Sequence, residues 1–71
     1  MKLDARKDPE AIFYLCIDKA TGKHIPDVFA ADDETGEYLV HRRDSFGKLV
    51  LRNGEVDTQL CKGFIELKRA Y

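Results

Sequence analysis

DKATGK at residues 18–23 and DDETGE at residues 32–37 share one pattern, Asp-x-x-Thr-Gly-x. An aspartate suits the first position of a turn because its carboxylate accepts hydrogen bonds from nearby backbone N–H groups. A glycine suits the last position because it adopts a positive φ without the strain that a side chain would bring. The pattern is typical of a type I turn that closes on a glycine bulge. Each stretch therefore predicts a hairpin turn between two strands.

Two further turns are indicated downstream. Residues 44–48 (DSFGK) have the same turn pattern in a shorter form, with an aspartate at the first turn position and a glycine at the last. Asn53-Gly54 is the strongest two-residue signal for a β-hairpin. Four such reversals in a row predict an antiparallel meander.

The runs between the turns favour strands because they are rich in β-branched and aromatic residues. We expect strands at residues 11–17, 24–31, 38–43, 49–51 and 56–69, with Pro26 at an edge or bulge and Gly63 bending the last run. The fold class predicted is all-β: a five-stranded antiparallel meander that forms a curled sheet or a small barrel. The expected core is Phe13, Leu15, Ile17, Val28, Phe29, Tyr38, Val40, Leu49, Leu51, Phe64, Ile65 and Leu67. A second apolar face would carry Ile12, Tyr14 and Cys16, with Ile25 or Leu39.

Residues 9–21 allow a second structural interpretation, a helix in place of a strand. Asp8 and Pro9 could begin a helix and Gly22 could end it, which would give an α+β fold with an N-terminal helix over residues 9–21 on a β-meander. Residues 1–8 show no pattern and are expected to form a flexible N-terminal arm, followed by a single β domain over residues 9–71.

Composition narrows the class of protein. The chain has 71 residues, 44% hydrophobic and 35% charged, with a net charge of −1. This balance is typical of one small globular domain and excludes a strongly basic nucleic-acid binder recognised by bulk charge. No apolar run is long enough to span a membrane, and the charged N-terminus does not read as a signal peptide. We therefore expect a cytoplasmic location.

Chemistry-bearing motifs are sparse. Cys16 and Cys61 are expected to be reduced thiols, and together with His24 and His41 they lack the close ligand pairs of structural zinc sites. No nucleophile elbow, phosphate-binding glycine loop or zinc-protease motif occurs in the sequence. The sequence therefore predicts no catalytic residues, no metal, no cofactor and no small-molecule substrate, and the protein is not expected to be an enzyme.

The charges are divided along the chain. Residues 24–41 hold acidic residues and no Lys or Arg, whereas the charged residues of 42–52 are Arg42, Arg43, Lys48 and Arg52 against Asp44 alone. Such segregation favours docking of an oppositely charged protein, or head-to-tail self-association. The candidate partner-binding residues are Asp32, Asp33, Glu34, Arg42, Arg43, Phe46, Lys48 and Arg52. The alternative is a small nucleic-acid-binding β-barrel that uses this basic hairpin, with Phe46 as a stacking surface.

Three blocks resemble small proteins of unknown function encoded by tailed bacteriophages and prophages. They are GKHIPDV at residues 22–28, ADDETGE at residues 31–37 and GFIEL at residues 63–67. The resemblance implies a phage or prophage accessory protein, either an assembly or virion component or a binder of a host target. It implies no particular binding residues, and the predicted mode of action is protein–protein contact.

Overall fold

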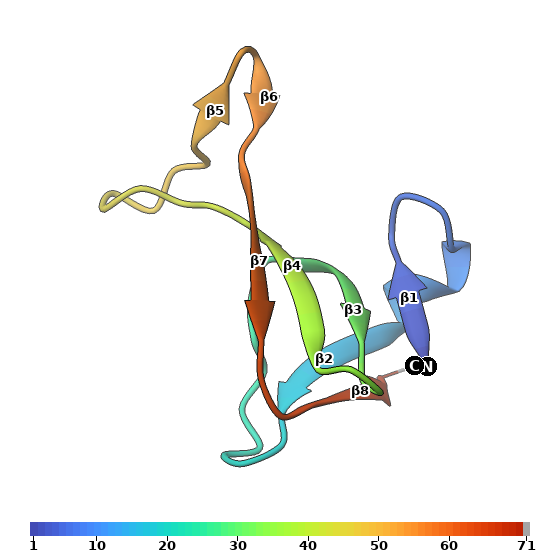
Figure 1. Cartoon of the computed structure of the whole chain (residues 1–71). Coiled ribbons are helices and arrows are strands. Elements are labelled where there is room, and N and C mark those ends of the chain that lie inside the picture. Colours follow the sequence, from blue (N-terminus) through green and yellow to red (C-terminus); the bar gives the residue numbers. More distant parts are fainter. Residues whose placement is uncertain (71) are drawn as a thin grey trace.

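The computed structural model describes residues 1–70, which form eight short strands and one 3-10 helix (Figure 1). In chain order these are β1 (Lys2–Asp4), η1 (Pro9–Phe13), β2 (Tyr14–Asp18), β3 (Val28–Asp32), β4 (Glu37–His41), β5 (Leu51–Arg52), β6 (Glu55–Val56), β7 (Thr58–Lys62) and β8 (Ile65–Arg69). Within residues 1–70, no helix has the length and hydropathy needed to cross a membrane.

All the strand pairs are antiparallel. β1, β3, β4 and β7 form a four-stranded sheet in the order β1-β3-β4-β7, β2 pairs with β8, and β5 pairs with β6. The chain bends between β7 and β8 at Gly63 and Phe64, and this bend carries it from the large sheet to the β2–β8 pair (Figure 1). The predicted all-β, curled antiparallel class is confirmed. The strands are shorter and more numerous than in the predicted five-stranded meander, and they do not close into a barrel.

The predicted turns are present with the expected backbone geometry. Gly22, Gly36, Gly47 and Gly54 all have φ between 75° and 80°. In the two repeated stretches the hydrogen bonds are also repeated: the N–H of Gly22 donates to the carbonyl of Asp18 (2.7 Å), and that of Gly36 to Asp32 (2.8 Å). Each aspartate also accepts an N–H two residues ahead on its Oδ1, at 3.0 and 2.9 Å. Equal sequence patterns thus build equal turns.

Two segments near the N-terminus differ from expectation. Residues 2–4 form β1, which pairs with β3 and buries Leu3, where a flexible arm was expected. Residues 9–21 do not form an α-helix: Pro9–Phe13 is a 3-10 turn, and the strand begins at Tyr14 rather than at Ala11. Proline at the start of η1 fits the first turn of a helix. The β-branched and aromatic residues that follow favour extended backbone.

The core is small. Among the described residues the buried hydrophobic side chains are Leu3, Cys16, Ala31 and Ile65. Cys16, Ala31 and Ile65 form one cluster, against which pack partly buried side chains from the segment before β3 and from three strands, namely Ile25, Val28, Tyr38 and Leu67. Ile65 and Leu67 therefore face inward, as the alternation in their strand predicted.

Several predicted core residues lie at the surface instead. Leu15 is 38% exposed, while Cys16, which was assigned to the outer face, is 5% exposed. The assignment was inverted because β2 is apolar on both alternating faces, so the sequence pattern does not distinguish them. Others from the predicted core that are exposed are Phe13, Leu49, Leu51 and Phe64.

Candidate interaction surface

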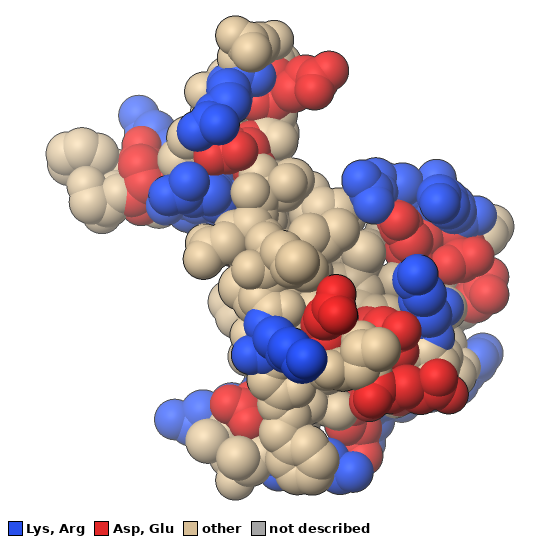
Figure 2. All heavy atoms as spheres, viewed as in Figure 1, with Lys and Arg blue, Asp and Glu red and all other residues tan. Residues whose placement is uncertain are grey.

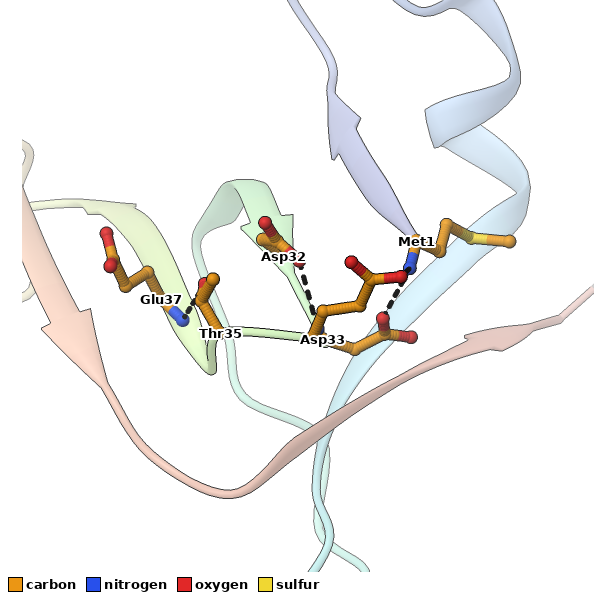
Figure 3. Close-up of polar contacts among 6 residues, drawn as sticks. Met1, Asp32, Asp33, Thr35 and Glu37 are labelled. Atoms are coloured by element: carbon orange, nitrogen blue, oxygen red, sulfur yellow. Dashed lines mark hydrogen bonds and ion pairs between the residues drawn. The ribbon is translucent and has the colours of Figure 1, made fainter.

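The acidic residues predicted to bind a partner lie at the turn between β3 and β4 (Figure 3). Asp32 holds the turn, since its Oδ1 accepts the N–H of Glu34 at 2.9 Å. The N-terminal ammonium group of Met1 lies 2.6 Å from Asp33 Oδ1 and 3.7 Å from a carboxylate oxygen of Glu34. The hydrogen bond to Asp33 raises the pKa of this ammonium group above its ordinary value. The acidic turn is thus partly neutralised by the chain's own N-terminus, which also joins β1 to the turn.

The predicted basic residues lie on a different part of the molecule. Residues 42–57, here called the arm, contain the turn at residues 44–47 and the β5–β6 hairpin, and they project from the body of the fold (Figure 1). The acidic and basic groups therefore do not form one site. The acidic groups lie at the turn between β3 and β4, whereas the basic groups lie on the arm.

The arginines of the arm are engaged in ion pairs. Arg43 donates from Nε and Nη2 to the two carboxylate oxygens of Asp27, at 2.8 and 3.0 Å, and from Nη1 to the carbonyl of Gly47 at 2.8 Å. The guanidinium of Arg43 lowers the pKa of Asp27. Arg42 and Arg52 both approach Asp57, at 3.3 and 3.9 Å. These ion pairs neutralise part of the positive charge of the three arginines. Lys48, on the same arm, is exposed.

Phe46 lies at the tip of the arm. Asp44 Oδ1 accepts the N–H groups of Phe46 and Lys48 at 2.8 and 3.0 Å, and these bonds form the turn that carries the ring outward. The Phe46 side chain is 85% exposed, and Leu49 and Leu51 on the same arm are also exposed. The arm therefore presents apolar side chains together with charges of both signs.

Sequence reasoning offered Leu39 as one option on a second apolar face but did not identify its neighbours on the outer face of the four-stranded sheet. The strand register aligns Ala30, Leu39 and Leu60 in one row across β3, β4 and β7. A groove of about 460 Å³ lies over Ala30, Leu39 and Leu60, with charged residues along its sides. Figure 2 shows an uncharged area over the region of β4 and β7, with acidic and basic side chains around it. Alternation at residues 37–41 could have indicated this face, but the position of Leu60 beside Leu39 depends on strand pairing.

The two thiols and the imidazole of His41 have different surroundings in the described part of the chain. Cys16 is buried, and burial raises the pKa of its thiol. Cys61 is a free, partly buried thiol on β7. The ring of His41 is stacked on Phe29 with 4.4 Å between centroids. Within residues 1–70, no group of three or more His, Cys, Asp and Glu residues is arranged to hold a metal ion.

No protein-family model matches the sequence, and no curated protein or solved structure matches the chain. The surface described above is therefore interpreted from its own geometry.

Proposed function

We propose that this protein is a non-enzymatic module that acts through protein–protein contacts. The observation that carries the proposal is its large uncovered surface. The accessible surface of the chain is 5335 Å², whereas a folded monomer of this mass, 8.1 kDa, exposes about 4,500 Å². The excess of about 800 Å² equals what one partner buries in a protein–protein interface of standard size.

The exposed surface includes many large apolar side chains. Nine of them are exposed, against the four hydrophobic residues that are buried in the described part of the chain. Single exposed apolar residues are common on protein surfaces, but a fold that exposes more large ones than it buries has little core of its own. Contact with another protein would remove these side chains from water and add to the stability of a small domain.

The arm and the outer sheet face are the parts of this surface that best suit a partner. Phe46 is an exposed aromatic on a projecting turn, the type of residue that anchors interfaces. The ion pairs of Arg43 and Arg42 hold the base of the arm, so Phe46 extends from a supported segment. The phage or prophage context that the sequence resemblance implies belongs to the same proposal. A virion component and a binder of a host protein would both use such a surface.

Affinity capture from the protein's own host tests the proposal. The wild-type chain is expected to retain a defined protein, and Phe46→Ala is expected to reduce its recovery at least about 10-fold, since interface anchors contribute 2 kcal/mol or more. Phe64→Ala is the matched control because Phe64 is also an exposed aromatic, 67% exposed, but lies at the β7–β8 bend. Equal recovery with Phe46→Ala and wild type would argue against the arm. Failure of the wild-type chain to retain any protein would argue against the proposed function.

A further inference from the structure

The two edge strands of the four-stranded sheet, β1 and β7, differ in how many of their outward backbone groups form hydrogen bonds. β1 is one edge, and the outward backbone groups of its last residue are already bonded: the N–H of Asp4 donates to Asp8 Oδ2 at 2.9 Å. The carbonyl of Asp4 accepts the N–H groups of Lys7 and Asp8 at 2.9 and 2.7 Å. The turn that follows β1 thus occupies the Asp4 end of this three-residue edge, which leaves little strand for another chain to pair with.

β7 is the other edge, and its outward groups are open. The N–H of Arg42 donates to Asp57 and that of Gly63 to Gly36, so the residues of β7 that bond to β4 are Gln59 and Cys61. The alternate residues, Thr58, Leu60 and Lys62, direct their backbone groups away from the sheet. Within the described chain, Leu60 and Lys62 have no hydrogen bond there.

The open stretch has defined ends. The N–H of Thr58 is bonded to the neighbouring Asp57 Oδ1 at 3.1 Å, and beyond Lys62 the carbonyl of Phe64 accepts the N–H of Lys19 at 2.9 Å. β7 spans five residues, about 17 Å of extended strand, and its open groups are those of Leu60 and Lys62 together with the carbonyl of Thr58. Leu60 lies at its centre and is 62% exposed.

We propose that β7 pairs antiparallel with β7 of a second copy of this chain, with Leu60 opposite Leu60 on the two-fold axis. This inference rests on the proposed function and specifies its partner. An antiparallel pair centred on Leu60 directs N–H groups of each copy at carbonyls of the other. It sets Lys62 opposite Thr58, so no like charges face each other.

The apolar row on the outer face supports a second copy as the occupant. In each chain Leu39 lies beside Leu60, so pairing would join two short apolar rows into one across a continuous sheet of eight strands. The net charge of −1 leaves little repulsion between copies.

Sedimentation velocity across protein concentrations of about 10 μM to 1 mM tests the proposal. Wild type is expected to shift toward twice the chain mass of 8.1 kDa as concentration rises. Leu60→Lys is expected to weaken this association at least about 10-fold because two lysines would then face each other. Ile12→Lys is the matched control, since Ile12 is 72% exposed but lies on η1, outside β7 and the arm, and it is expected to associate like wild type.

A charge-pairing experiment separates loss of the interface from loss of the fold. Leu60→Lys and Leu60→Glu are each expected to be monomeric with the far-ultraviolet circular dichroism of wild type. An equal mixture of the two is expected to form heterodimers, since opposite charges would then face each other across the axis. A mixture that stays monomeric overturns the β7 pairing, as does loss of association in Ile12→Lys.

The outcomes distinguish this inference from the function on which it rests. Wild type that stays monomeric throughout the concentration range overturns self-association through β7. If that same protein still retains a different protein through Phe46, the proposed function stands without the dimer.

Discussion

Gly36 illustrates how a single residue links a local turn to the rest of the fold. Its φ of +80° is required by the turn, and its carbonyl accepts the N–H of Gly63 at 2.9 Å. A Cβ at position 36 would collide with the carbonyl oxygen of Gly63. The first requirement could be predicted from the sequence. The second could not, because it depends on the bend between β7 and β8 meeting this turn.

Substitution of Gly36 by alanine is therefore expected to cost more than the same change in the other turn of the pair. Gly22 has a φ of +75°, but a Cβ there would meet nothing within 4 Å. Gly22→Ala should lower the free energy of unfolding by about 1 kcal/mol through backbone strain alone. Gly36→Ala should lower it by about 3 kcal/mol or more, because steric overlap adds to the strain. Urea denaturation of both variants measures the difference, and equal losses would refute the contact.

The sequence likewise reveals the charged residues but not the ion pairs that they form. Asp27, Arg42 and Arg43 could be recognised from the sequence as surface residues. The bidentate pairing of Arg43 with Asp27 could not, since 16 residues separate them. Asp27 adopts a φ of 64° just after Pro26, and aspartate is among the few residues that tolerate this region. Sequence reasoning therefore found the charges of the candidate surface but not their partners.

At the scale of elements, β1 is the strand that the sequence did not predict. It is three residues long, and only Leu3 is apolar within it, so no alternation could be seen. Its place is set by pairing with β3 and by the contact between Met1 and Asp33. By contrast, the alternation in β8 was readable because Glu66 and Lys68 separate its apolar residues.

Removal of the Leu3 side chain tests whether β1 is part of the cooperative fold. Leu3 is 8% exposed, and Leu3→Ala is expected to lower the free energy of unfolding by about 2–3 kcal/mol. Leu51→Ala, which truncates an exposed leucine, should change it by less than about 0.5 kcal/mol. Thermal and urea denaturation of both variants provides the measurement. A loss of unfolding free energy for Leu3→Ala as small as that for Leu51→Ala would show that residues 1–8 are flexible, as expected from the sequence.

The whole molecule is defined by the imbalance between a small core and a large surface. Turn glycines determine where the chain reverses, and the resulting sheets bury few side chains. The sequence could predict this imbalance in outline, because 71 residues without an evident helix leave a small sheet uncovered. It could not identify which face is uncovered, because β2 is apolar on both sides and the row of Leu39 and Leu60 is created by pairing. The proposed function depends on this uncovered surface.

Site-specific photo-crosslinking in the host tests that claim most directly. A photoreactive residue placed at Phe46 or at Leu60 is expected to yield a discrete protein adduct, including one with a second copy of this chain at Leu60. The same residue placed at Glu66, exposed on β8, serves as the control. The account predicts strong adducts at Phe46 or Leu60 and only background at Glu66. Background at all three positions would contradict it.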